Sequence, residues 1–95
     1  MQVFSVDMEA HSVWTFDSLP CLLQVCSGGH TYIVDLLALH DHMHLLKPAF
    51  EDPRILKVFH GGGADVQWLQ QLGLFPVHVL DTCELAQVNA ALPIQ

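Results

Sequence analysis

The chain has 95 residues, 52% of them hydrophobic, and a formal net charge of −7, so it holds at most one small domain. With only three Lys and Arg residues, it is not a protein that binds nucleic acid phosphates unaided, although metal ions can supply the missing positive charge. No apolar run reaches the roughly 18 residues of a membrane span. Three cysteines without a Cys-x-x-Cys spacing indicate reduced, buried thiols of an intracellular protein, not a disulfide framework or a zinc site.

The first predicted element is a strand over residues 3–11 that begins apolar and ends in two acids, Asp7 and Glu9. Side chains two apart on a strand share a face, which places these carboxylates roughly 6 to 7 Å apart at Cα. Carboxylates that close repel each other unless a cation neutralises both, and Mg²⁺ or Mn²⁺ suits oxygen ligands best. The simpler alternative is a solvated strand end with two unrelated acids, and the pair alone does not exclude it.

The next stretch predicts a hairpin and then a helix. Residues 21–26 and 31–35 are strand-like runs separated by Gly28 and Gly29, a hairpin signal, and with the first strand they form an antiparallel meander. Residues 36–46 carry apolar side chains at roughly helical spacing, and Asp35 is placed to cap that helix. Residues 49–52, between Pro48 and Pro53, are predicted to be a turn-rich connection.

The second half of the sequence predicts strands that are connected by crossover helices. A strand over residues 55–59 runs into His60 and three glycines, and a helix from Ala64 ends at Gly73. A strand over residues 77–80 and a helix over residues 82–91, capped by Asp81, complete the order βββαβαβα. This order predicts an α/β sheet of mixed direction whose later strands are parallel. Functional side chains gather at strand carboxyl ends in such sheets, so Asp65 would join the acid pair if the first and fourth strands are neighbours.

Several of these features also have simpler explanations. The glycine-rich turn is neither a P-loop nor a dinucleotide fingerprint, and its glycines would let the backbone approach either a neighbouring strand or a nucleotide. Asp65, in the first turn of its helix, could simply complement the helix dipole. Histidines 40, 42 and 44 are interpreted as a solvated helix face, because no further ligand is placed to complete a zinc site.

Taken together, the motifs resemble the DEDD superfamily of 3′→5′ exonucleases, and within it the RNase D group and the catalytic subunit of the nuclear RNA exosome. The Asp7-x-Glu9 pair is weakly specific alone but strongly specific together with His60-Gly61 and Asp65-x-x-x-Leu69 at this distance. The match runs through nearly the whole chain. The resemblance implies a ribonuclease H-like fold, in agreement with the predicted order of elements.

The resemblance also implies a two-metal hydrolase that releases nucleoside 5′-monophosphates from the 3′ end of single-stranded RNA. Asp7 would bridge two Mg²⁺ or Mn²⁺ ions, Glu9 would bind one of them, and Asp65 would hold the second. His11, His60 and Gly61 would lie at the substrate. The implied partners are RNA and subunits of the RNA exosome, without a membrane, and the implied location is the nucleus.

One family motif has no counterpart here. The last motif, Tyr-x-x-x-Asp, would supply a fourth carboxylate and a tyrosine that orients water, but Tyr32 is the only tyrosine and no Asp follows Asp81. Residues 1–95 are therefore interpreted as part of an exonuclease domain, its amino-terminal portion, with little activity on its own. The alternative is a catalytically inactive, exonuclease-like module that binds a protein or a metal.

Overall fold

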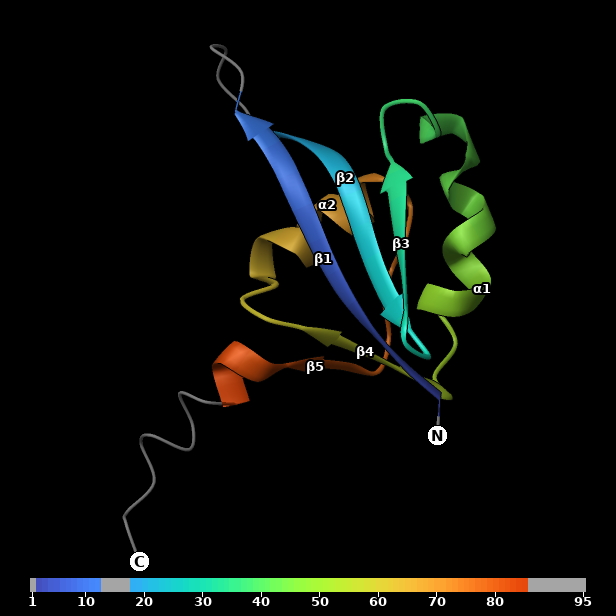
Figure 1. Cartoon of the computed structure of the whole chain (residues 1–95), viewed down its shortest axis with the longest axis vertical. Helices are drawn as coiled ribbons and strands as arrows, with labels where there is room; N and C mark the ends of the chain where they lie inside the picture. The colour runs from blue at the N-terminus through green and yellow to red at the C-terminus, as the bar shows by residue number, and fades with distance from the viewer. Residues whose placement is uncertain (1, 13–17, 86–95) are drawn as a thin grey trace, which may run out of the picture.

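The computed structural model describes residues 2–12 and 18–85, which form a mixed sheet with helices (Figure 1). The strands lie in the order β3-β2-β1-β4-β5. Their bounds are Gln2–Ser12 for β1, Ser18–Ser27 for β2, His30–Asp35 for β3, Ile55–Phe59 for β4 and Val79–Asp81 for β5. The helical segments are the 3₁₀ helix η1 (His40–Leu46), α1 (Lys47–Phe50) and α2 (Gly63–Gln71). No helix in this part of the chain is long and apolar enough to cross a membrane.

The predicted meander is confirmed, with longer strands than expected. β1 pairs antiparallel with β2, and β2 pairs antiparallel with β3. Gly28 and Gly29 connect β2 to β3 with φ angles of 57° and 80°. These left-handed conformations suit glycine, and two in succession give the tight turn that matches the twist of a hairpin.

The crossover half is also confirmed in outline. β4 pairs parallel with β1, and β5 pairs parallel with β4, so the first and fourth strands are neighbours as the hypothesis required. β4 covers the predicted residues, whereas β5 begins at Val79, two residues later than expected. Residue 78, where the predicted strand would have run, is His78 with a φ of 58°, a left-handed conformation that interrupts an extended strand. Residues 82–85 are helical, and the rest of the last predicted helix lies outside the described residues.

The helix predicted over residues 36–46 is confirmed only from residue 40 onward, and it is a 3₁₀ helix rather than an α-helix. Residues 36–39 form a turn, in which the Asp35 carboxylate accepts the backbone N–H groups of Leu37 and Ala38, and η1 follows. The α-helical turn lies where a turn-rich connection was predicted, with Pro48 in its first turn. Proline cannot donate the hydrogen bond that would continue a helix from η1, but it fits the start of a new one.

The core lies on one face of the sheet. Phe4, Val6 and Met8 of β1 are buried, and they pack with buried residues of β2, β4, the helical segments and the connections between elements: Leu23, Leu36, Met43, Phe50, Phe59, Leu69 and Leu74. Figure 1 shows α2 passing behind β1 and β2, consistent with Leu69 belonging to this cluster. The rings of Phe4 and Phe50 meet edge to face at 5.3 Å between centroids.

The opposite face carries a different set of side chains. Ser5, Asp7 and Glu9 of β1 alternate with the buried residues and are exposed. On the same face, Val3 and Ile33 are 47% and 67% exposed. The described part of the chain therefore covers one face of the sheet with apolar packing and leaves polar and apolar side chains together on the other.

Lys57 of β4 is fully buried, which is rare for a lysine. Its ammonium group donates to the carbonyl oxygens of Asp52, Ile55 and Val77 at 2.6, 2.8 and 3.1 Å. Burial lowers the pKa of Lys57, and the negative charge of Asp52 opposes that change. All three ammonium protons are thus used to join the turn before β4 to the segment before β5.

α2 is defined at both ends by glycine. At its end, Gly73 has a φ of 85°, its N–H bonds to the Gln70 carbonyl, and the Leu74 N–H bonds to the Leu69 carbonyl, which together make a Schellman motif. At its start, Gly62 packs directly on Phe59, since a Cβ at Gly62 would lie 2.6 Å from the Phe59 Cβ. The helix start is thus held against the end of β4.

The two glycines at residues 62 and 63 should respond oppositely to alanine. Gly62→Ala forces a methyl group into the buried Phe59 side chain and should lower the free energy of unfolding by about 1–3 kcal/mol. At Gly63 nothing lies within 4 Å of an added Cβ, and Gly63→Ala should be neutral or stabilising by up to about 1 kcal/mol. Urea unfolding of both variants measures this, and an equal loss in both would contradict the packing of Gly62.

Lys57→Met keeps the length of the side chain but removes all three donors. The three carbonyl groups would then lose their partners, and each unpaired buried group costs about 1–3 kcal/mol. We expect a large loss of stability in urea unfolding. Lys47→Met is the matched control, because Lys47 is a partly exposed lysine whose ion pair with Glu51 lies at the surface. A stable Lys57→Met protein would show that the buried ammonium is dispensable.

Candidate active site

The acid pair lies within β1, not at its end as predicted. β1 continues to Ser12 because it remains paired with β2 past the acids, with Asp7 opposite Gln24 and Glu9 opposite Leu22. The parallel ladder with β4, however, stops at Ser5 and Val58. Asp7 therefore lies just beyond the ladder, where the chain leaves β4 and turns into α2. Both acids are on the exposed face of the strand, as the two-residue spacing predicted.

Asp65, in the first turn of α2, is half-buried and lies beside Asp7. Its pKa is raised, first because burial disfavours its charge and then because the negative charge of Asp7 is close. The charge of Asp81 acts in the same direction, whereas the Met8 backbone N–H opposes the rise. The same N–H donates to Asp7 Oδ1 at 3.0 Å. The first turn of α2 thus brings a second carboxylate to the place where β1 carries Asp7.

Glu9 is less closely associated with Asp65 than Asp7 is. It shares the exposed face of β1 with Asp7, and the register of β1 against β2 shifts directly after it, where Ala10 pairs with Pro20. Such bulges bend a strand and re-aim its side chains, and they recur next to active sites. Within residues 2–12 and 18–85, no three His, Cys, Asp or Glu side chains are grouped closely enough to hold a metal ion without rearrangement. Of the three predicted acids, Asp7 and Asp65 are close enough for the charge of Asp7 to raise the pKa of Asp65.

The turn between β4 and α2 is fixed by hydrogen bonds from the end of β5. Gly61, whose φ is 68°, donates its N–H to Asp81 Oδ1 at 2.9 Å, and Gly62 donates to Asp81 Oδ2 at 2.8 Å. These bonds, together with those from Cys83 and Glu84, hold the pKa of Asp81 below its ordinary value. Asp81 is the predicted helix cap, and it also binds the turn across the sheet.

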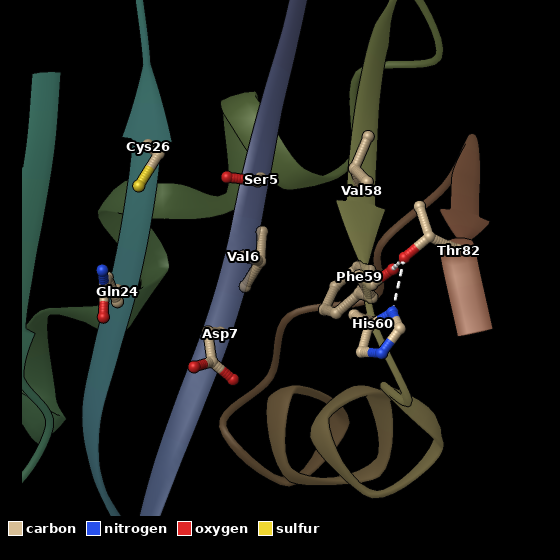
Figure 2. Close-up of a pocket in the computed structure, with 9 residues that line it drawn as sticks. All are labelled: Ser5, Val6, Asp7, Gln24, Cys26, Val58, Phe59, His60 and Thr82. Atoms are coloured by element: carbon tan, nitrogen blue, oxygen red, sulfur yellow. Dashed lines mark hydrogen bonds between the residues drawn. The ribbon is translucent and has the colours of Figure 1, made fainter. Parts of the chain in front are cut away.

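His60 is oriented by Thr82. The Thr82 hydroxyl donates its one proton to the Phe59 carbonyl at 3.2 Å, and it lies 2.8 Å from His60 Nδ1 (Figure 2). With that proton on the Phe59 carbonyl, the second bond is made by the tautomer of His60 that carries its proton on Nδ1. In neutral His60 the other ring nitrogen, Nε2, is then left as a hydrogen-bond acceptor.

A pocket of about 330 Å³ opens beside these residues on the exposed face of the sheet. Figure 2 shows Asp7 and Gln24 on neighbouring strands, with His60 and Thr82 at the ends of β4 and β5. Its lining consists of Ser5, Val6, Asp7, Gln24, Cys26, Val58, Phe59, His60 and Thr82. Asp7 lines this pocket, whereas Asp65 does not.

The remaining predicted substrate residues and the cysteines differ in how far the structure describes them. The backbone of His11 pairs with Leu19, and its side chain lies outside the described residues. Gly61 is in the turn, but its N–H is already donated to Asp81. Cys26 and Cys83 are free thiols, as predicted, but half-buried and not buried. Hydrogen bonds, first from Thr31 and then from Ser5, lower the pKa of Cys26.

Sequence reasoning missed the pocket residues Gln24 and Thr82. Gln24 lies directly opposite Asp7 in the β1–β2 ladder, and its signal was a lone polar residue within an apolar strand. Thr82 was predicted only as the first residue of the helix over residues 82–91, with no role at the site. Its contact with His60 depends on the register of β4 against β5, with Phe59 opposite Asp81, which spacing along the chain does not reveal.

Comparison with known proteins gives this geometry a context. The family model described as 3'-5' exonuclease matches residues 1–93. The chain belongs to this exonuclease family. Its relatives include protein RRP6-like 3 of Arabidopsis thaliana, 43% identical, and human exosome complex component 10, 41% identical, each over 88 residues that make up 92% of this chain. The chain spans about a tenth of the length of these relatives.

Solved structures agree in fold. The catalytic core of RRP6 from Trypanosoma brucei superposes with a TM-score of 0.85 and 37% identity, over 99% of this chain and 26% of that one. RNase D of Escherichia coli gives a TM-score of 0.75 with 25% identity, over 96% of this chain and 24% of that one. The predicted ribonuclease H-like α/β fold and the likeness to RRP6 and RNase D are therefore confirmed.

Asp65→Asn should stabilise the protein at pH 7. A carboxyl whose pKa is raised by folding favours the folded state fully below its unfolded pKa, near 3.8, and disfavours it once the pH passes the raised folded value. Asparagine imitates the protonated form, so the gain in thermal midpoint should be present at pH 7 and shrink toward zero below about pH 3.8. A gain that persists at low pH would show that charge is not its cause.

Proposed function

We propose that this chain carries the metal-binding part of a 3′→5′ exoribonuclease site, with Asp7, Glu9 and Asp65 as its acids. The observation that supports this most strongly is the approach of Asp65 to Asp7, from a helix and a strand, in a chain of the exonuclease family. A half-buried carboxylate beside a second, exposed one is unfavourable when both are charged, unless a cation lies near both. Their oxygen atoms are the ligands that Mg²⁺ and Mn²⁺ prefer, so the residues present fit such ions.

The basic residues give a second argument for metal ions. All three Lys and Arg side chains of the chain are engaged within the protein. Lys47 pairs with Glu51 at 3.2 Å, Arg54 pairs with Asp52 at 2.8 Å, and Lys57 is buried among carbonyl groups. A chain of net charge −7 that acts on a phosphodiester needs another source of positive charge, and divalent ions supply it.

The three acids would take different roles in metal binding because they lie at different positions. Asp7, between the pocket and Asp65, is placed to serve two ions, with Glu9 on the same face of β1 and Asp65 from α2 completing the set. When bound, two such ions supply an activated water and stabilise the leaving 3′ oxygen. The contribution of the protein is to hold the carboxylates together on two rigid elements before any ion arrives.

The remaining residues would hold the substrate. The Nε2 atom of neutral His60 is an acceptor beside Asp7 in the pocket, suited to a ribose hydroxyl donor. Gly61 would contribute the shape of the turn and a close approach of backbone, since its N–H is already used by Asp81. His11, two residues beyond Glu9 on β1, is proposed to lie near the terminal nucleotide.

We propose single-stranded RNA as the substrate, read from its 3′ end, with nucleoside 5′-monophosphates as products. In support, one solved neighbour is a Trypanosoma brucei RNase D in complex with RNA U12, with a TM-score of 0.72 and 28% identity over 85% of this chain and 30% of that one. Because several relatives are named exosome complex component 10, we also propose association with RNA exosome subunits and a nuclear location.

A second candidate function is binding without turnover. It is favoured by the ungrouped third acid and by the absence of a Tyr-x-x-x-Asp motif from these 95 residues. An ion with fewer ligands is less well placed, and an error of about 1 Å in position can cost roughly 10²-fold in rate. We therefore expect weak trimming of RNA by this chain, with ion binding intact.

The test combines ion binding with RNA trimming. Free Mn²⁺ is followed by electron paramagnetic resonance while the chain is titrated, and 5′-labelled single-stranded RNA is incubated with Mn²⁺ and resolved at single-nucleotide length. We expect Mn²⁺ binding that Asp7→Asn and Asp65→Asn each weaken by about tenfold or more. We also expect slow shortening from the 3′ end that both variants abolish.

Asp35→Asn is the matched control. It removes one carboxylate charge from a cap on the edge strand β3, which β2 separates from β1, and should leave Mn²⁺ affinity within about twofold. Binding that depends on Asp7 but gives no trimming would favour the binding module. Mn²⁺ affinity that is equal in wild type, Asp7→Asn and Asp65→Asn would reject the metal site itself.

A further inference from the structure

Asp81 makes more hydrogen bonds than a helix cap requires. Its Oδ1 accepts the N–H groups of Cys83 and Glu84, at 2.9 and 3.4 Å, which is the ordinary role of an N-cap carboxylate. The same carboxylate accepts the N–H groups of Gly61 and Gly62 from a different part of the chain. Four backbone donors therefore converge on one side chain, and two of them are not explained by capping its own helix.

Those two donors belong to the turn that starts α2. The N-cap residue of α2 is Gly62, whose missing side chain cannot cap the helix. Asp81 thus provides from β5 a side-chain anchor that the sequence before α2 lacks. It can do so because β5 pairs in parallel with β4, which places Asp81 opposite Phe59 at the end of the ladder.

Gly62, which Asp81 holds, is within one helical turn of Asp65 in the proposed metal site. Gly62 accepts the N–H of Val66 at 2.9 Å, so its position sets the first turn of α2. Asp65 lies in that turn, beside Asp7 and the Met8 backbone. A shift of Gly62 must therefore move the Asp65 carboxylate relative to β1.

We infer that Asp81 is a positioning residue: its carboxylate fixes residues 61 and 62 and thereby places Asp65 beside Asp7. We assign Asp81 no ligand role, because its oxygens serve the backbone, with three N–H groups on Oδ1 and one on Oδ2. The inference rests on the proposed function for its consequence in metal binding, but the placement of Asp65 is a property of the metal-free protein.

The variants distinguish three properties of Asp81: its hydrogen bonds to Gly61 and Gly62, its capping of its own helix, and its negative charge. Asp81→Asn keeps one acceptor oxygen but turns an NH₂ group toward a backbone N–H. Asp81→Glu keeps the charge and changes the reach. Asp81→Ser keeps an N-cap for Cys83 and Glu84 but is too short to span to the glycines, and it replaces Asp81→Asn if that variant does not fold. Asp35→Asn, the loss of a carboxylate cap that bonds only to its own turn on the edge strand β3, is the control.

The metal-free measurement is the backbone amide spectrum of the ¹⁵N-labelled chain. Asp65→Asn first shows how the Met8 amide resonance responds when the neighbouring carboxylate is lost. We expect Asp81→Asn and Asp81→Glu to shift the amides of Gly61, Gly62 and also Met8, and Asp35→Asn to leave all three in place. Displaced glycine amides with an unmoved Met8 would overturn the inference, because the effect of Asp81 would end within the turn.

The second measurement is Mn²⁺ affinity in the same proteins. Outer groups that orient ligands typically change metal affinity by 10- to 100-fold, so we expect a loss of about tenfold in Asp81→Asn and Asp81→Glu. Wild-type affinity in Asp81→Glu would overturn positioning in favour of simple charge. If Asp7→Asn binds Mn²⁺ as the wild type does, the proposed function fails, and the Met8 amide alone then decides whether Asp81 places Asp65.

Discussion

The site is organised by the proximity of two negative charges, on Asp7 and Asp65, that folding brings together without a neutralising base. Asp7 lies on β1 just past the end of its parallel ladder with β4, and Asp65 lies in the first turn of the helix that follows β4. Burial and the charge of Asp7 both raise the pKa of Asp65. The fold therefore maintains an arrangement that is unfavourable in the absence of a cation, and such costs are typical of sites kept for function.

The surrounding structure resists the separation of those charges. Gly62 is held on one side by its contact with Phe59 and on the other by Asp81, which leaves α2 little freedom at its start. The end of α2 is closed by the Schellman motif, with Leu69 and Leu74 both fully buried. Lys57 joins the segments before β4 and β5 and so supports the ladder from which these turns depart.

Much of the fold followed from local patterns. The Gly28-Gly29 turn, the apolar run of β4 and the Gly73 stop are short-range signals, and each was interpreted correctly. The helix predicted over residues 36–46 begins four residues late and is a 3₁₀ helix. Leu37 and Leu45, which were counted toward its apolar positions, are 59% and 66% exposed. Periodicity cannot tell a buried leucine from an exposed one, and Pro48 was the better guide to where an α-helix begins.

The candidate site was harder to predict in detail. The spacing of Asp7 and Glu9 indicated a shared face, and the parallel pairing of β1 with β4 was needed to bring Asp65 to it. The strand was predicted to end at the acids because polar residues often end strands, but the antiparallel partner β2 extends past them. The roles of Asp81 and Thr82 toward the turn depend on the β4–β5 ladder, a contact between residues about 20 positions apart, which one sequence does not disclose.

The central claim is that Asp7 and Asp65 share a divalent cation. Crystals of the chain soaked in MnCl₂, with data collected at the manganese absorption edge, locate the ion through its anomalous scattering. The account predicts an anomalous peak within ligand distance of both carboxylates, about 2.0 to 2.3 Å as for small divalent ions with oxygen ligands. A peak bound elsewhere, or none at a Mn²⁺ concentration that saturates binding in solution, would contradict it.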